Sequence, residues 1–222
     1  MSDPFDLAGP VREPASGGKP TSLVVFLHGY GADGEDLIGL APHWQDILPD
    51  TAFLSPHAPF PCEEAPYGRQ WFGFRDRDEA ALMAGTELAA RILTAFLDRA
   101  LAASGLAADR LALVGFSQGA MLALHLALRC EKQFAGVVGY SGTLIAPDRL
   151  AEEIQSRPPV LLVHGDADPV VPFTAMDAAA KALRAVGVEV VTERRPGLPH
   201  AIDPTGLAKG GRFLAERIGP QR

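Results

Sequence analysis

The sequence predicts a single domain of the α/β class, in which a mostly parallel central sheet is covered by helices on both faces. Short continuous apolar runs, typical of parallel strands buried on both faces, alternate along the chain with longer segments of helical periodicity. This alternation implies right-handed βαβ units. The length of 222 residues is enough to bury one core and too short to require two domains of ordinary size.

The predicted strands are apolar runs bounded by glycine, proline or polar residues. They cover residues 23–27, 52–54, 111–116, 136–140, 160–163 and 188–192. Between them, apolar residues three and four positions apart predict helices over residues 35–48, 79–103, 118–129, 147–155, 173–186 and 204–218. Gly105 and Gly187 lie just past predicted helix ends, and Asp203 is a candidate N-cap before Pro204.

Two segments lack a regular pattern. Residues 1–20 mix proline, glycine and charge, so we expect a loose N-terminal lead-in that holds one short edge strand, followed by a single domain over residues 21–222. The longest irregular stretch inside that domain is 55–78, which contains Trp71, Phe72 and Phe74. Loops of this length in a compact domain are usually functional or mobile.

Composition and charge exclude several classes of function. A net charge of −7 provides no basic stripe for phosphates, so neither nucleic acid nor an anionic membrane is an expected partner. No apolar run approaches the roughly 18 residues of a membrane span, and the N-terminal residues lack the apolar core of a secretory signal. Cys62 and Cys130 form no C-x-x-C pattern, so we expect reduced thiols and a cytoplasmic location without stable membrane insertion.

One motif points to chemistry. Gly115-Phe116-Ser117-Gln118-Gly119 is a G-x-S-x-G sequence directly after a predicted strand and directly before a predicted helix. In the α/β-hydrolase fold this motif is a strained strand-to-helix turn that exposes the serine hydroxyl, and side chains at the two glycine positions would clash within the turn. Ser117 is therefore the predicted nucleophile. Ser141 also follows a predicted strand but lacks the second glycine at the required spacing.

A serine hydroxyl needs a base and an orienting carboxylate, which follow in the order Ser, Asp, His in this fold. After the predicted strand 160–163 come Asp166 and Asp168. Asp168 is the preferred acid, and Asp166 is the alternative, with a turn-forming role as its simpler explanation. Among six histidines, His200 alone follows these acids and is the predicted base. Read as a metal site, His164, Asp166 and Asp168 lack a further clustered ligand, so no metal is expected.

Acyl transfer also requires two amide donors for the oxyanion. The backbone of Gln118, directly after the nucleophile, supplies one. The second is expected from the glycine-rich segment after the first strong strand, where Leu27 is the preferred residue and Gly29 and Tyr30 are close alternatives. No P-loop lysine is present in this segment, which argues against a phosphate cradle.

Taken together, these motifs resemble those of the carboxylesterase, lysophospholipase and acyl-protein thioesterase family of small α/β-hydrolases, which lack a large cap domain. The resemblance extends from about Leu23 to Leu214. It rests on residues 27–34, Arg69-Gln70-Trp71-Phe72, residues 115–119, residues 164–172 and His200. It implies the triad Ser117, Asp168 and His200, with the backbone amides of Leu27 and Gln118 as the oxyanion hole.

The resemblance also bears on the substrate site. It implies that Trp71 and Phe72 lie beside an acyl pocket, although aromatic pairs in loops are more often core plugs. Tyr30 and Leu198 are further expected substrate contacts. Pro199 precedes the histidine where the family often has glycine, and this proline restricts Leu198 at the rim of the pocket.

The predicted function is a serine carboxylester hydrolase that acts on short- to medium-chain acyl esters through an acyl-enzyme. It requires no metal or organic cofactor. The expected partner is a small-molecule or lipid-like acyl ester, and the resemblance favours a homodimer. An acyl-protein thioesterase or lysophospholipase acting on long chains is the alternative, and a catalytically silent hydrolase-like binding protein is a further one.

Overall fold

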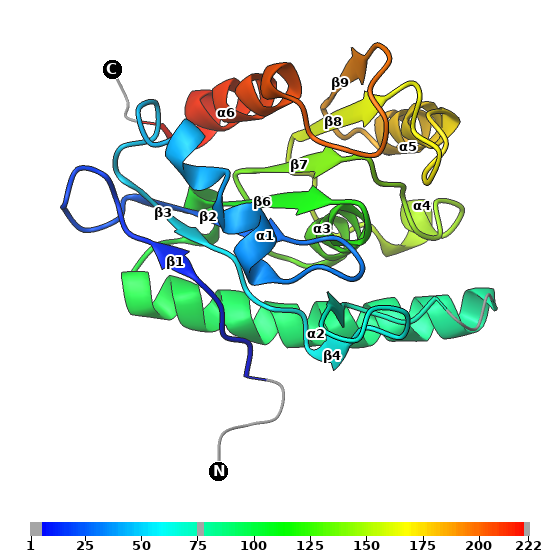
Figure 1. Cartoon of the computed structure of the whole chain (residues 1–222), viewed down its shortest axis with the longest axis horizontal. Helices are drawn as coiled ribbons and strands as arrows, with labels where there is room; N and C mark the ends of the chain where they lie inside the picture. The colour runs from blue at the N-terminus through cyan, green and yellow to red at the C-terminus, as the bar shows by residue number, and fades with distance from the viewer. Residues whose placement is uncertain (1–5, 75–77, 220–222) are drawn as a thin grey trace.

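The computed structural model of the chain describes residues 6–74 and 78–219. Its centre is a seven-stranded sheet in the order β1-β3-β2-β6-β7-β8-β9, with helices on both faces (Figure 1). All neighbours pair in parallel except β1, which is antiparallel to β3. The predicted fold class is confirmed. The strands are β1 (Val11–Arg12), β2 (Ser22–Leu27), β3 (Thr51–Leu54), β6 (Leu111–Phe116), β7 (Gly136–Tyr140), β8 (Val160–Gly165) and β9 (Val190–Arg195).

The sheet divides the core into two layers, and helices pack on each face of it. Strand residues such as Val25 and Leu113 pack on one face with α2, α3 and α5. Their neighbours Val24 and Ala112 pack on the other face with α1 and α6, as expected for side chains that alternate along a strand. The helices are α1 (Gly34–Ile38), α2 (Glu79–Ser104), α3 (Gln118–Arg129), α4 (Leu150–Glu153), α5 (Thr174–Ala185) and α6 (Pro204–Ile218).

Some predicted boundaries are wrong. The helix predicted over 35–48 ends at Ile38 and is followed by a separate 3-10 turn over Ala41–His43, because Pro42 in that turn has no N–H to continue an α-helix. The buried Trp44 then donates from Nε1 to the Leu207 carbonyl oxygen of α6, 3.0 Å away. The helix predicted over 147–155 shortens to α4, and the last strand lies further along the chain than predicted, over Val190–Arg195.

The segments without a regular pattern hold short strands. In the lead-in, Val11 and Arg12 of β1 pair with Leu54 and Phe53 of β3 at the edge of the sheet. The stretch 55–78 contains a small antiparallel hairpin of β4 (Phe60–Pro61) and β5 (Arg69–Gln70). Its residues 75–77 lie outside the described residues. Side-chain periodicity gives no signal for strands of two residues.

Helix α2 is the longest element of the fold. With 26 residues and a mean hydropathy of 1.4 in its most apolar window, it is long and apolar enough by composition to cross a membrane. In this structure it lies along the sheet (Figure 1), and Ala89, Leu93 and Leu97 pack in the core cluster that includes α3. In this structure α2 is therefore a helix that packs against the core of the domain.

The start of α3 lies unusually close to β2. A methyl group on Gly119 would overlap the carbonyl oxygen of Leu27, and one on Gly115 would overlap the backbone of Gly119. Both glycines of the G-x-S-x-G motif are therefore required by backbone packing, as predicted. This approach sets the position of Ser117 between them.

We predict that Gly119→Ala destabilises the protein by about 3 kcal/mol or more, because backbone on both sides must shift to admit the methyl group. Chemical denaturation of the variant measures this loss. Gly18→Ala is the control, since a methyl group there meets only Ser16 Oγ, at 3.6 Å. Equal stability of the two variants would contradict the packing argument.

Candidate active site

Ser117 occupies the turn between β6 and α3 in a strained conformation. Its φ of 52° and ψ of −117° lie in a region that non-glycine residues rarely adopt. Its amide donates to the Tyr140 carbonyl oxygen of β7 at 2.9 Å. The conformation is therefore held by the neighbouring strand, and it places Ser117 at the N-terminus of α3.

Asp168 lies in the loop after β8 with its side chain completely buried. Its Oδ1 accepts from the amides of Val170 and Val171 at 2.8 and 2.9 Å, and its Oδ2 lies 2.8 Å from His200 Nδ1. Burial opposes ionisation, but the hydrogen bonds from His200 and the two amides outweigh it and hold the pKa of Asp168 below its ordinary value. The group is a carboxylate at neutral pH.

This carboxylate sets the tautomer of His200. A carboxylate only accepts hydrogen bonds, so Nδ1 carries the proton and Nε2 is left with the lone pair of a base. The imidazole packs on the ring of Phe116, the residue before Ser117, with 4.8 Å between centroids. Within the part of the chain that the structure describes, the Ser117 hydroxyl donates to no partner. In unliganded hydrolases the hydrogen bond from the serine hydroxyl to the histidine is often long, and it shortens when substrate binds.

Asp166 points away from the acid position. Its carboxylate, for which a hydrogen bond to its own turn is expected, reaches the next loop instead. There it accepts from the Gly197 amide at 2.6 Å, and it also accepts from Nε of Arg194, a residue of β9, at 2.8 Å. His164 Nε2 donates to the Val171 carbonyl oxygen at 2.9 Å. His164 Nε2 also lies 3.4 Å from Asp168 Oδ2, whereas Asp166 binds Gly197 and Arg194. Residues 6–74 and 78–219 contain no group of three side chains that could hold a metal ion.

The amides considered as oxyanion donors have different surroundings in the structure. Gln118 begins α3, and its amide has no hydrogen-bond partner among the described residues. Leu27, in contrast, lies within β2, paired with Gly115 in the sheet. The amides of Gly29 and Tyr30, in the loop that follows, have no hydrogen-bond partner in the same part of the chain. Gly29 lies against the nucleophile, since a methyl group there would be 3.6 Å from Ser117 Cβ.

Trp71 and Phe72 are buried core residues, at 0 and 1% exposure. The Gln118 side chain holds their backbone: Oε1 accepts from the Trp71 amide and Nε2 donates to the Phe72 carbonyl oxygen, each at 2.8 Å. Trp71 Nε1 also donates to the carbonyl oxygen of His28 at 3.0 Å. The geometry favours the core-plug interpretation, in which these residues anchor the loop to the nucleophile turn.

The other two expected substrate contacts are half-buried. The ring of Tyr30 packs on Phe74 with 5.3 Å between centroids, and its hydroxyl donates to Glu63 Oε2 at 3.5 Å. Leu198 contributes its backbone, because its carbonyl oxygen accepts from the Ala167 amide at 3.2 Å. Tyr30 thus borders the loop that contains Phe74, and Leu198 joins two loops.

A cavity of about 660 Å³ lies beside the start of α3. Met121 lines it and is one helical turn from the nucleophile, with its amide donating to the Ser117 carbonyl oxygen at 3.1 Å. The other large apolar lining residues are Phe74, Leu82, Met83, Leu144 and Ile145. Sequence reasoning missed them; the spacing of Met121 four residues after Ser117, on the same helix face, is the one signal that was available.

These features define a class of protein before any comparison is made. A strained serine between a parallel strand and a helix, beside a paired histidine and carboxylate, belongs to the serine hydrolases of the α/β-hydrolase fold. The family model described as Phospholipase/Carboxylesterase matches residues 12–218, and the chain belongs to this family. It is an enzyme that cleaves ester bonds.

Individual relatives agree with this membership. The chain is 28% identical to acyl-protein thioesterase 1 of Aspergillus fumigatus, over 91% of this chain and 90% of that protein. Its fold matches the crystal structure of esterase PE8 with a TM-score of 0.91 and 43% identity, covering 96% of this chain and 99% of the other. Acyl-protein thioesterase 2 of Zea mays matches with a TM-score of 0.77 and 26% identity, over 96 and 100% of the two chains.

Two buried histidines outside the triad make stability depend on pH. His28 accepts from the Ala58 amide at Nε2 and contacts the Gly29 carbonyl oxygen through Nδ1, at 3.0 and 2.8 Å. Burial lowers the pKa of His28 to about 4, and it lowers the pKa of His125 to about 4 as well. Both residues are therefore neutral in the folded protein at pH 7.

We predict that the free energy of unfolding is highest above pH 6.5 and falls as the pH decreases to about 4. Each histidine binds a proton more readily in the unfolded chain, so its contribution is complete above the unfolded pKa and is lost towards the folded one. The loss is roughly 3 kcal/mol for each histidine. Denaturant titrations from pH 7.5 to 4 measure this loss. His125→Gln should reduce the change in the free energy of unfolding over this pH range, and replacement of the exposed His43 is the control.

Proposed function

We propose that Ser117, His200 and Asp168 carry out two-step acyl transfer. His200 Nε2 takes the hydroxyl proton as Ser117 attacks the ester carbonyl, and the Asp168 carboxylate stabilises the resulting imidazolium. The proton then passes to the leaving group, and water repeats the sequence on the acyl-enzyme. The observation that carries this proposal is the 2.8 Å contact of a buried carboxylate with His200, whose ring packs beside the strained serine turn.

The proposed oxyanion hole consists of the amides of Gln118 and Tyr30. Both amides are unpaired within the described residues, and both adjoin residues that contact the nucleophile turn. Tyr30 takes the place of Leu27 because Leu27 is a residue of the sheet, whereas Tyr30 follows Gly29 in a loop that borders Ser117. Unpaired donors at fixed positions stabilise the developing charge without reorganisation.

The proposed substrates are esters with short- to medium-chain acyl groups. The cavity of about 660 Å³ beside Met121 is large enough for an alkyl chain and is lined mainly by apolar side chains. Asp78, Glu79 and Arg149 also line it. A long chain that filled the cavity would desolvate these charged groups, which is unfavourable, so a chain confined to the apolar part is preferred.

A long-chain thioesterase is the second candidate, supported by the similarity to acyl-protein thioesterase 1 of Aspergillus fumigatus. Thioesters and oxygen esters require the same triad chemistry, so acyl-chain length and the leaving group distinguish the two candidates.

We also propose a cytoplasmic location, since Cys62 and Cys130 are both free thiols.

We predict that Ser117→Ala lowers turnover of p-nitrophenyl acetate by on the order of 10⁴-fold or more, with the fold intact, and abolishes labelling by a fluorophosphonate probe. Ser141→Ala is the matched control, because Ser141 also follows a parallel strand with a positive φ, of 48°. It should keep both activity and labelling. If the wild-type protein is not labelled, a catalytically silent binding protein becomes the better explanation.

We predict that kcat/KM for p-nitrophenyl esters peaks between four and eight carbons and falls for palmitoyl substrates. Leu82→Trp, which fills part of the cavity, should lower kcat/KM for octanoate about tenfold, or ~1.4 kcal/mol, and leave acetate unaffected. Val11→Trp is the control, since Val11 lies on the edge strand β1, is 52% exposed and does not line the cavity. A rate that peaks with a palmitoyl thioester would replace this substrate class with the second candidate.

A further inference from the structure

The proposed base sits on a connecting segment with no regular structure. Residues 196–203, named here the histidine loop, join β9 to α6 and carry His200 (Figure 1). The contact with Asp168 holds Nδ1, but the direction of Nε2 depends on the backbone of the loop as well. Because catalysis requires Nε2 to face the Ser117 hydroxyl, the groups that hold this backbone bear on the rate.

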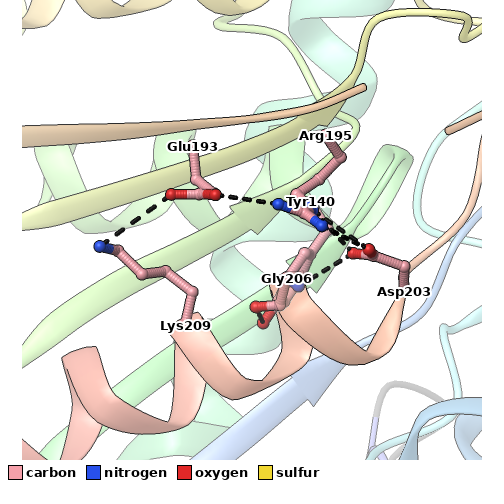
Figure 2. Close-up of polar contacts among 6 residues, drawn as sticks. All are labelled: Tyr140, Glu193, Arg195, Asp203, Gly206 and Lys209. Carbon is pink, nitrogen blue, oxygen red and sulfur yellow. Dashed lines mark hydrogen bonds and ion pairs between the residues drawn. The ribbon is translucent and has the colours of Figure 1, made fainter. Parts of the chain in front are cut away.

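An ion pair joins the residue before the histidine loop, Arg195, to the last residue of the loop, Asp203 (Figure 2). Arg195, the last residue of β9, donates from Nε to Asp203 Oδ1 and Oδ2 at 3.1 Å each, and from Nη2 to Oδ2 at 2.9 Å. Hydrogen bonds from Arg195 lower the pKa of Asp203, so the pair is ionised at neutral pH. Forked arginine–carboxylate pairs of this kind restrict orientation as well as distance.

The ion pair is also tied to the start of α6. Asp203 is the N-cap of this helix, where Oδ1 accepts from the Gly206 amide at 2.9 Å. Tyr140 donates its hydroxyl to the Gly206 carbonyl oxygen at 3.3 Å, and the Tyr140 carbonyl oxygen accepts from the Ser117 amide. Tyr140 of β7 therefore links the turn of Ser117 to α6, the helix that follows the histidine loop; Figure 2 shows its side chain beside Gly206.

A second set of contacts holds the side of the loop. Asp166 accepts from the Gly197 amide at 2.6 Å, and its own amide donates to the Arg195 carbonyl oxygen at 3.1 Å. The Ala167 amide donates to the Leu198 carbonyl oxygen. A side chain at Gly165 would overlap that same oxygen, so the loop lies directly against the segment that carries Asp168.

We propose that Asp166, Arg195 and Asp203 are positioning residues, which hold the histidine loop from two sides and so direct His200 towards Ser117. This inference rests on the proposed triad and extends it to residues that do not touch the substrate. Asp166 connects the loop of the acid to the loop of the base, and the Arg195–Asp203 pair fixes the ends of the latter. Displacement of a base by about 1 Å can reduce the rate about 100-fold.

The test compares variants that loosen the loop without touching the triad. Arg195→Met and Asp203→Asn each remove the ion pair, and asparagine keeps an oxygen for the N-cap of α6. Asp166→Ala removes the acceptor for Gly197, whereas Asp166→Asn retains an amide oxygen there. For p-nitrophenyl acetate we expect kcat to fall about 10- to 100-fold with KM within about twofold, a matching fall in the fluorophosphonate labelling rate, and partial recovery in Asp166→Asn relative to Asp166→Ala.

The control is Glu189→Gln, which breaks the 3.0 Å ion pair with Arg217 outside the histidine loop and should leave kcat unchanged. Unchanged kcat in both Arg195→Met and Asp166→Ala, with only the melting temperature lowered, would overturn the proposal. A rise in KM at constant kcat would overturn it too, since it indicates a role in binding substrate. Failure of the triad itself is recognised separately, by a Ser117→Ala variant that stays active.

Discussion

The N-terminus of α3 packs against the end of β2 so closely that no side chain fits at Gly119, where it would overlap the Leu27 carbonyl oxygen. This backbone contact forces the turn between β6 and α3 and holds Ser117 at a positive φ. It also brings the loop after β2 to Ser117. Among residues 6–74 and 78–219, the Gly29 and Tyr30 amides of this loop have no hydrogen-bond partner. Parallel packing of strand against helix thus builds the serine turn and its neighbouring donors together.

The remaining parts of the site come from the carboxyl ends of β8 and β9, which pair in parallel with Gly165 opposite Arg195. This register places the loop of Asp168 beside the loop of His200, where Asp166 and the backbone of Leu198 join them. The buried charge of Asp168 is tolerated because His200 and two amides donate to it. The partly exposed Asp203 likewise accepts from Arg195 and from the first turn of α6.

The cavity proposed for the acyl chain is built from other elements than the triad. The cavity beside Met121 is formed where the start of α2, the first turns of α3 and the segment after β7 meet, so its lining comes from elements far apart in the chain. Trp71 and Phe72, which resemblance assigns to the pocket, are instead buried and bonded to Gln118. The same loop nonetheless reaches the cavity through Phe74, next to the ring of Tyr30.

The amino-acid order alone determined the α/β class, the turn at Ser117 and the candidates Asp168 and His200, because strand periodicity and the glycines of the motif are local properties of the chain. Tertiary structure decided what depends on distant residues. Examples are the end of α1 at Ile38 with Trp44 bonded across to Leu207, the role of Asp166 in binding Gly197, and the exchange of Leu27 for Tyr30 as the proposed oxyanion donor. An amide's partner and a cavity's lining depend on which strands and helices become neighbours, and no short stretch of sequence contains that information.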